Sequence, residues 1–443
     1  MPGPPPVPVA GDTKLPKHVD VVVIGGGIIG TSTALELSER GHRVALCEKG
    51  GIAHEQSSRN WGWVRMTLRD PREIPLMAEA IRVWQRLDAR IGRDTGYAQA
   101  GIVYLAKTED QLESCARWAR HVEPHQIPCQ ILDRAEVKAR FPEMQAEVAG
   151  ALSLPMDGRA EPQKAAPAIA EAAREAGAAI LTRCAVRGIE TSAGAVSGVV
   201  TERGRIACEA VVLAGGAWSN LFCGNTGLDL PQLCVINHVL RTVPVEGGPE
   251  PALKHPDFSI RKRQDGGYTV ATTSRNVCPI VPNSFRYFRQ FLPALRMDYR
   301  NLQFRLGAEF FRELTAKRRW AMDEVSPFEE TRVLDPATTQ TMNDDILRRA
   351  GEVFPALKDA GVAQRWAGCI DVTPDAIPVI SKVETLPGFH IATGFSGHGF
   401  GIGPGTGRLM ADLVTGATPC VDAHEFRFSR FTDGTRVRPI ATI

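Results

Sequence analysis

The feature that most constrains the fold is a glycine-rich turn near the N-terminus. An apolar strand over residues 21–24 runs into this turn, and a helix expected over residues 28–40 ends at Gly41. A second strand over residues 43–47 leads to Glu48. The glycines of the turn are Gly25, Gly27 and Gly30. These elements predict a parallel βαβ unit whose helix N-terminus binds a dinucleotide pyrophosphate, while Glu48 accepts the ribose hydroxyls of the adenosine half.

Composition is that of a globular protein in a reducing compartment. The 443 residues are 43% hydrophobic and carry a formal net charge of +2, which gives no indication of nucleic-acid binding. The ten cysteines include no C-x-x-C pair, so neither a metal site nor a disulfide framework is expected. No stretch of roughly 18 apolar residues spans a membrane, and the proline-rich residues 1–18 are expected to be a disordered leader. We expect a cytoplasmic protein that is either soluble or peripheral to the inner face of the membrane.

The dinucleotide-binding domain is expected to be assembled from three separate stretches. The second stretch carries an alanine-rich helix and a strand that runs into Gly215 and Trp218. The third carries a strand that enters a glycine-rich segment, residues 394–405, followed by a helix expected over residues 406–415. Such returns to one parallel sheet are typical of a doubly wound, Rossmann-like α/β domain. The three stretches are residues 19–75, 155–225 and 362–425.

The sequence between these stretches predicts a second domain. Residues 76–154 and 226–361 are richer in alternating strands and are expected to form an antiparallel-sheet domain that binds the substrate. Within it, residues 284–320 hold nine basic and three acidic residues, a net charge of +6, together with many phenylalanines. This composition predicts a helical insertion. Its aromatic residues either pack on the body beneath a solvated basic face or dock on an anionic membrane surface or a partner.

The order of three motifs resembles one family of flavoenzymes. The N-terminal glycine turn is followed by the motif at residues 214–219 and by the motif at residues 393–400. In this order they resemble the D-amino-acid-oxidase-like, FAD-dependent oxidoreductases, which include glycine and sarcosine oxidases. A closer resemblance is to the L-amino-acid deaminases of that superfamily. It is carried by residues 52–59, 184–191 and 323–329, and by the place of the insertion.

The resemblance implies noncovalently bound FAD, in agreement with the motifs. The glycine turn would hold the pyrophosphate, Val186 would meet the adenine through its backbone, and residues 394–400 would run past the isoalloxazine ring. In similar sarcosine oxidases the cysteine that attaches flavin falls at the position of Gly368, so Cys369 is expected on the opposite face as an ordinary buried thiol. The residues assigned to FAD are Gly25, Gly27, Ile28, Gly30, Glu48, Lys49, Gln56, Ser57, Ser58, Val186, Gly215, Trp218, Gly394, Gly397, His398, Gly399 and Phe400.

Two arginines are candidates for binding a substrate carboxylate. Arg65 stands where sarcosine oxidases keep a carboxylate-binding arginine, and a guanidinium makes bidentate contacts with a carboxylate; the alternative is an ion pair with Asp70. Arg275 is the second candidate because the deaminases carry a matching arginine. Trp63 is expected either to wall the pocket or to pack in the core. His398 is expected at the flavin, where it would orient the ring, and no catalytic base is assigned.

The reaction implied is the oxidative deamination of an α-amino acid, with L-amino acids favoured. Hydride passes from Cα to flavin N5, and the imino acid hydrolyses to a 2-oxo acid and ammonia. The alternative is oxidation of a secondary amino acid (sarcosine-, hydroxyproline- or opine-like), because residues 397–400 look more like the sarcosine and glycine oxidases. A third hypothesis is a flavin-binding subunit of a larger complex. The acceptor is oxygen or a quinone, and Thr269, at the position of an oxygen-activating lysine, favours a dehydrogenase.

Overall fold

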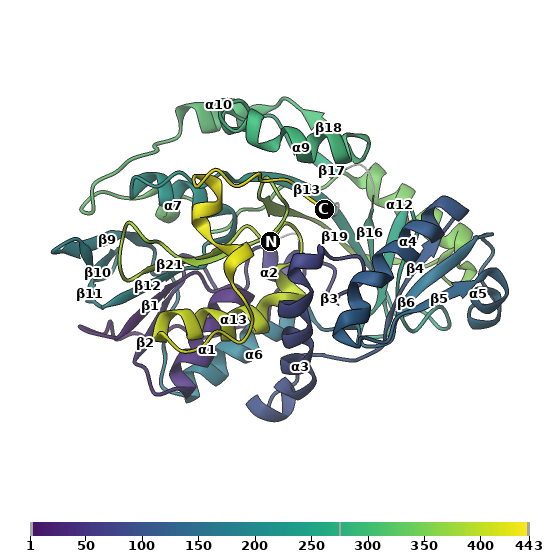
Figure 1. Cartoon of the computed structure of the whole chain (residues 1–443), viewed down its shortest axis with the longest axis horizontal. Helices are drawn as coiled ribbons and strands as arrows, with labels where there is room; N and C mark the ends of the chain where they lie inside the picture. The colour runs from purple at the N-terminus through teal and green to yellow at the C-terminus, as the bar shows by residue number, and fades with distance from the viewer. Residues whose placement is uncertain (1–2, 274–275, 441–443) are drawn as a thin grey trace.

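Two sheets lie side by side along the long axis of the molecule (Figure 1). The computed structural model describes residues 3–273 and 276–440. One sheet is mostly parallel, and the larger one is mostly antiparallel. This arrangement confirms the expected α/β fold, a Rossmann-like dinucleotide-binding domain beside an antiparallel-sheet domain.

The parallel sheet is built from short apolar runs that are covered on both faces. Within the described residues it has six strands in the order β20-β21-β12-β1-β2-β8, and β20 alone runs antiparallel to its neighbour. Val23 packs toward the helices on one face, and Val22 packs toward a three-stranded meander on the other. Burial of both faces explains the absence of polar alternation in these strands. Their bounds are β1 (Val21–Ile24), β2 (Val44–Cys47), β8 (Ala179–Leu181), β12 (Ala210–Leu213), β20 (Val379–Lys382) and β21 (Phe389–Thr393), and those of the meander are β9 (Val186–Ser192), β10 (Ala195–Thr201) and β11 (Gly204–Ala207).

The second sheet joins segments from the middle of the chain. In the part of the chain that the structure describes it has ten strands in the order β18-β17-β13-β16-β15-β14-β4-β6-β5, with β19 paired to β13 outside this path. The strands are β4 (Ile102–Ala106), β5 (Gln130–Asp133), β6 (Gly150–Leu154), β13 (Leu233–Thr242), β14 (Ala252–Lys254), β15 (Phe258–Lys262), β16 (Tyr268–Thr272), β17 (Asn276–Pro279), β18 (Leu302–Arg305) and β19 (Val362–Val372). Helices α4 (Glu109–Val122), α5 (Arg134–Arg140) and α12 (Gln340–Val353) lie at its outer side (Figure 1).

Helix α13 (Gly399–Thr415) starts seven residues earlier than the sequence predicts. The glycine-rich segment that was expected to be a loop forms its first two turns because its glycines allow close helix packing. A Cβ atom at Gly403 would lie 2.8 Å from the side chain of Ile28, and one at Gly407 would lie 2.6 Å from backbone of α1 (Ile28–Glu39). The low helix propensity of glycine is therefore outweighed by contacts with α1.

Two boundaries of the expected domains differ from the structure. Strand β19 belongs to the large sheet, because it pairs along its whole length with β13 rather than with the parallel sheet. Helix α3 (Ile74–Ile91) packs against α13, and its Trp84 indole donates to the Gly401 carbonyl at 2.7 Å. This helix therefore belongs to the core of the dinucleotide-binding domain, together with α6 (Pro162–Glu175).

The leader is ordered rather than disordered over residues 3–18. The Val7 amide donates to the Gln163 carbonyl at 2.8 Å, and the Asp12 amide donates to the Ile180 carbonyl at 2.7 Å. A proline-rich chain is extended and stiff, so its free backbone groups can pair with a neighbouring surface at a small entropic cost. The leader thus lies along α6 and β8.

Residues 284–320 form the expected helical insertion. Helices α8 (Pro282–Arg286), α9 (Phe288–Asp298) and α10 (Ala308–Thr315) lie at the top of the view in Figure 1 together with β18, which pairs with β17. Their exposed side chains include Phe285, Phe311 and Leu314, so part of the aromatic content faces outward. Over the described residues, no helix is both long and apolar enough to cross a membrane.

Candidate active site

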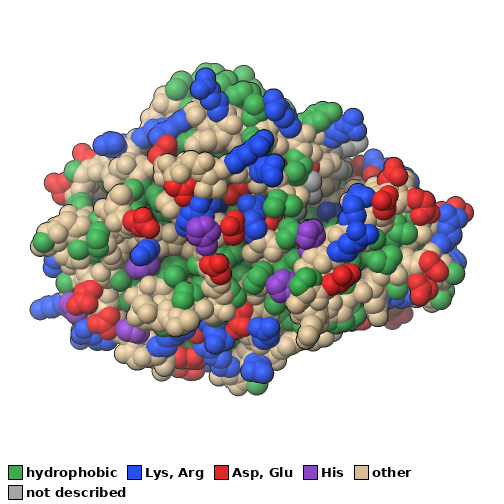
Figure 2. All heavy atoms as spheres, in the orientation of Figure 1, with side chains coloured by type: hydrophobic (Ala, Val, Ile, Leu, Met, Phe, Trp, Pro, Cys, Tyr) green, Lys and Arg blue, Asp and Glu red, His purple; other side chains and the backbone are tan. Residues whose placement is uncertain are grey.

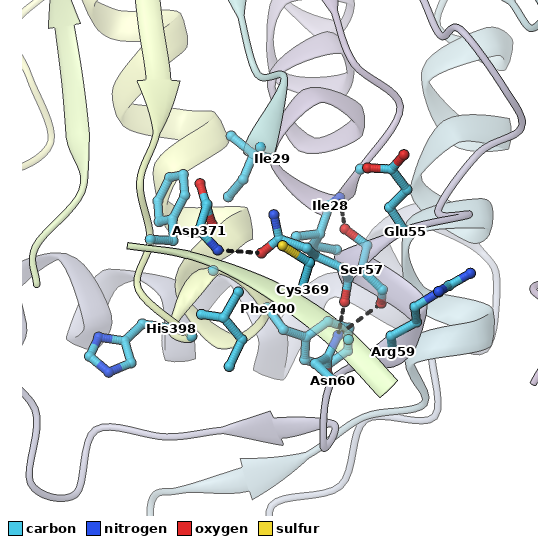
Figure 3. A pocket seen from close by; sticks show the side chains of 18 of the residues that line it. Ile28, Ile29, Glu55, Ser57, Arg59, Asn60, Cys369, Asp371, His398 and Phe400 are labelled. Atoms are coloured by element: carbon cyan, nitrogen blue, oxygen red, sulfur yellow. Dashed lines mark hydrogen bonds between the residues drawn. The ribbon is translucent and has the colours of Figure 1, made fainter. Parts of the chain in front are cut away.

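One cavity connects the two domains. It begins at the glycine turn after β1 and at Glu48, passes α2 (Gln56–Arg59) and β19, and ends against Tyr104 and Lys254 on the large sheet. Its cofactor end therefore lies at the carboxyl ends of the parallel strands, where ligands bind in folds of this kind. Figure 3 shows side chains of its middle part.

Most residues that were expected to bind the cofactor line this cavity. Gly30, Ser58 and Gly394 do not line it, because Gly30 packs α1 on β1, the Ser58 hydroxyl donates to a backbone carbonyl, and Gly394 forms a left-handed turn with φ +74°. Arg275 lies outside the described residues. Arg65 and Trp63 line the far end of the cavity. The expected cofactor residues that line it are Gly25, Gly27, Ile28, Glu48, Lys49, Gln56, Ser57, Val186, Gly215, Trp218, Gly397, His398, Gly399 and Phe400.

The glycine turn leaves its backbone open to the cavity. Gly25 has φ +109°, and a Cβ atom there would lie 2.3 Å from the Ala214 carbonyl oxygen. A Cβ atom at Gly30 would lie 1.9 Å from the Gly25 carbonyl oxygen, so any side chain would separate α1 from β1. The N-terminus of α1 has no side-chain cap from Gly27, and the amide of Ile28 donates to Ser57 Oγ at 2.8 Å. This end of the helix can therefore receive a phosphate group.

Glu48 is held in place by backbone amides. Its two carboxylate oxygens accept hydrogen bonds from Gly26 N and Gly50 N, both at 2.7 Å, and each oxygen keeps a lone pair for a hydroxyl donor. Burial raises the pKa of Glu48, and the two backbone hydrogen bonds oppose this shift. The ammonium of Lys49 pairs with Glu55 at 2.7 Å and lies 4.4 Å from the Trp218 ring centroid. Lys49 therefore fixes the wall of the cavity beside Glu48.

The middle of the cavity is organised by the buried Asp371. Its Oδ2 accepts from Gly394 N at 2.8 Å and from Gln232 Nε2 at 2.9 Å, which ties β19 to the end of β21. Cys369, two residues earlier, lines the cavity (Figure 3). Cys369 is a buried thiol as expected, and because its neighbours Gly368 and Ile370 also line the cavity, the expectation that it lies on the opposite face from the flavin stays a prediction. Noncovalent attachment stays a prediction, and release of flavin on acid precipitation tests it.

His398 stands at the N-terminus of α13 and forms a buried pair with Glu73. The Nδ1 atom of His398 lies 3.1 Å from Glu73 Oε2, whereas His398 Nε2 and Glu73 Oε1 have no partner among the described residues. Burial raises the pKa of Glu73 to about 7, although the neighbouring Arg69 lowers it. His398 borders the cavity, and Glu73 fixes the orientation of its ring.

The far end of the cavity has aromatic walls. The rings of Trp61 and Trp63 are edge to face at 5.3 Å, and those of Trp63 and Tyr104 are edge to face at 6.1 Å. The indole N–H of Trp63 is buried without a partner in the described part of the chain. The guanidinium of Arg65 donates to the Tyr104 hydroxyl and to the Thr67 carbonyl. These walls are apolar and leave the Trp63 N–H as a polar group for a bound molecule.

The ion-pair alternative for Arg65 is not what the structure contains. Asp70 pairs with Arg72, with Nη2 and Oδ2 at 2.8 Å, and Arg65 has no carboxylate partner within the described residues. Two further cations at this end, Arg69 and Lys254, were missed by the sequence analysis. The spacing of Arg69 four residues after Arg65 was a weak signal. Lys254 gave none, because its position depends on the pairing of β14 with β4.

The comparisons with known proteins agree with this fold and cavity. The model of the DAO family of FAD dependent oxidoreductases matches residues 20–413. The chain belongs to this family. It is 28% identical to a glycine oxidase of Geobacillus kaustophilus over 93% of this chain and 97% of that protein. It is similar in structure to an L-amino acid deaminase of Proteus myxofaciens, with a TM-score of 0.93, 34% identity and 97% of each chain covered. An L-amino acid deaminase of Proteus vulgaris gives a TM-score of 0.91 and 32% identity over 96% of this chain and 100% of that chain.

The DAO family uses FAD, and the residues of the cavity fit this cofactor. The bare glycine backbone and the N-terminus of α1, which receives no side-chain cap from Gly27, suit a pyrophosphate, and the carboxylate of Glu48 keeps acceptor capacity for ribose hydroxyls. The N-terminus of α13 reaches the cavity through Gly399 and Phe400, where its dipole stabilises negative charge. The protein is therefore an FAD-dependent oxidoreductase that acts on amino acids, and this cavity has residues that would hold the cofactor.

Proposed function

We propose that the protein deaminates an L-α-amino acid oxidatively, giving a 2-oxo acid and ammonia. The observation that carries this proposal is Arg65, a cation that has no carboxylate partner among the described residues and lies at the aromatic end of the cavity. A guanidinium in such a site matches the carboxylate that every α-amino acid carries. Similarity over the whole chain to two L-amino acid deaminases supports the choice of substrate.

The residues of the far end position the substrate. Arg65 binds the carboxylate, and the walls formed by Trp61, Trp63 and Tyr104 hold the amino acid in one orientation and exclude water. FAD, when bound, accepts the two electrons and the hydrogen that leave Cα. No carboxylate lines this end within the described residues, and the substrate is proposed to react with its amine in the neutral form. The Glu73–His398 pair orients the edge of the cofactor pocket.

A second candidate function is the oxidation of a secondary amino acid. The observation that favours it is the sequence at residues 397–400, which borders the cavity from the N-terminus of α13. The similarity to a glycine oxidase over 97% of that protein supports it as well. An N-alkyl group would need space beside the amine, whereas an L-amino acid needs space only beside Cα.

Anaerobic reduction of the bound flavin distinguishes these candidates. The FAD-loaded protein is mixed with L-amino acids, D-amino acids and N-methyl amino acids, and bleaching of the flavin absorption is followed. The proposal predicts rapid bleaching by L-amino acids, whereas faster bleaching by N-methyl derivatives would establish the second candidate. If none of the three sets bleaches the flavin, the protein is a flavin-binding subunit rather than an amino-acid oxidoreductase.

The electron acceptor is proposed to be a quinone reached at a membrane surface. Thr269 is buried, accepts hydrogen bonds from Arg261 and Arg263 at 3.2 Å, and does not line the cavity. Thr269 stands at the position of an oxygen-activating lysine, and its hydroxyl carries no positive charge that could activate oxygen. Green and blue side chains lie together along the top of the molecule in Figure 2, where the insertion of residues 284–320 is exposed. This combination of exposed phenylalanines and arginines suits peripheral contact with an anionic membrane.

A further inference from the structure

Three cationic side chains line the far end of the cavity without a carboxylate among them. Arg65 and Arg69 follow β3 (Trp63–Val64), and Lys254 ends β14 on the large sheet. The carboxylates that line the cavity within the described residues are Glu48, Glu55 and Asp371; the first two are engaged near the glycine turn and Asp371 in the middle of the cavity. The far end therefore carries positive charge that the protein itself does not neutralise.

The three cations also keep unused hydrogen-bonding capacity. Arg69 donates through Nε to the Arg65 carbonyl at 3.0 Å, but its buried Nη1 has no partner within the described residues. Arg65 and Lys254 both lie beside the ring of Tyr104, with the Arg65 Cζ and the Lys254 Nζ at 5.6 and 5.2 Å from its centroid. In the described part of the chain, the ammonium of Lys254 forms neither a hydrogen bond nor an ion pair.

The nearest carboxylates behind the cavity wall interact with groups other than the three cations. Asp157 accepts from the amides of Met66 and Thr67 at 2.7 and 3.1 Å, and burial raises its pKa to about 6. Glu73 is paired with His398, and Asp298 accepts from Asn301. None of these carboxylates lies within 4.0 Å of one of the three cationic groups. Unpaired cations clustered in a partly buried site are costly, and a bound anion removes that cost.

We infer that the substrate carries a second carboxylate. It is a dicarboxylic amine, in which the additional carboxylate lies either on the side chain of an acidic amino acid or on an N-carboxyalkyl group. Arg65 binds the carboxylate on Cα, while Arg69 and Lys254 bind the second one. This inference rests on the proposed function, because it names the substrate class of the same site. A single carboxylate neutralises only one of the three positive charges.

Equilibrium binding tests the inference without catalysis. The FAD-loaded protein is titrated with glutarate and with valerate, which have the same chain length and differ by one carboxylate, and flavin absorption is followed. The expected result is a Kd for glutarate at least tenfold lower than for valerate, with the difference shrinking at high salt. Equal or weaker binding of glutarate overturns the inference.

Flavin reduction then separates the two sources of the second carboxylate. L-Glutamate is compared with L-glutamine, and iminodiacetate is compared with N-ethylglycine. Faster reduction by the compound with two carboxylates in either pair supports the inference. L-Glutamate would place the second carboxylate on the side chain, and iminodiacetate would place it on the N-carboxyalkyl group. If only L-glutamine or N-ethylglycine, which carry a single carboxylate, reduces the flavin, the inference fails and the proposed function stands. If no compound reduces it, the proposed function fails, and the glutarate titration still decides the question of the anion site.

Substitutions at Lys254 assign the site to a residue. Lys254→Met should lower the preference for glutarate over valerate about tenfold, whereas Lys254→Arg should retain most of it. The exposed Lys107, which follows β4 outside the cavity, gives the matched control Lys107→Met, and this variant should keep the full preference. An unchanged preference in Lys254→Met contradicts the assignment.

Discussion

Removal of the Arg65 guanidinium tests how the substrate carboxylate is held. Arg65 lines the aromatic end of the cavity, and its described partners are the Thr67 carbonyl and the Tyr104 hydroxyl, not a carboxylate. A bound carboxylate therefore receives its charge-assisted hydrogen bonds directly. Each such bond contributes about 1.5–3 kcal/mol, so the loss of two in Arg65→Met should cost about 3 kcal/mol or more. That value corresponds to a fall of about 150-fold in the second-order rate constant for flavin reduction.

The assay is anaerobic stopped-flow reduction of the flavin over a range of substrate concentrations. Arg65→Lys should recover part of the loss, because an ammonium keeps the charge but not the planar pair of donors. Arg82→Met is the matched control, since Arg82 lies on the outer face of α3 with a largely exposed side chain paired to Glu79. FAD content is measured in every variant. A fall of less than fivefold in Arg65→Met, with FAD content intact, would refute the role of Arg65.

Three other perturbations test the surroundings of the site. Folding raises the pKa of Glu73 to about 7, so the folded state holds a proton that the unfolded state releases above its ordinary pKa of 4.5. The stability of the wild type relative to Glu73→Gln should therefore fall by up to about 3 kcal/mol from pH 5 to pH 8 in denaturant unfolding, and a constant difference would contradict this sign. Gly407→Ala should destabilise the protein by about 1–3 kcal/mol, because its Cβ would lie 2.6 Å from the α1 backbone. Gly224→Ala is the control, since a Cβ at Gly224 meets open space and should not destabilise the protein. Equal melting temperatures for the two variants would be evidence against close packing of α13 on α1. Replacing the exposed Phe285 and Phe311 by serine should weaken cosedimentation with anionic vesicles, and undiminished binding would exclude this surface as the contact.

Local signals in the sequence were sufficient for most of the dinucleotide-binding domain. The strand, glycine turn and helix at residues 21–39 are read from contiguous residues. The glycine-rich segment before residue 406 was harder, because its propensity predicts a loop. Its helical structure follows from contacts with α1 and α3, which lie more than 300 residues away in the chain.

The far end of the cavity could be predicted only in part. Arg65 was accessible through its resemblance to a family motif, whereas Lys254 faces the same cavity because β14 pairs in parallel with β4 and sets Lys254 opposite Tyr104. Strand pairing of this kind joins residues 150 positions apart and leaves no local periodic signal. The neighbours of β19 could likewise be assigned only once its pairing with β13 was known.

The central claim is that this cavity oxidises an amino acid at FAD, and single-turnover stoichiometry under anaerobic conditions tests it most directly. The FAD-loaded protein is mixed with a limiting amount of L-amino acid, and the reduced flavin, the 2-oxo acid and the ammonia are quantified together. The proposal predicts one 2-oxo acid and one ammonia for each flavin reduced, and about 150-fold slower formation of all three in Arg65→Met. A flavin that stays oxidised with every amino acid and N-alkyl amino acid, in a protein with a full complement of FAD, would contradict it.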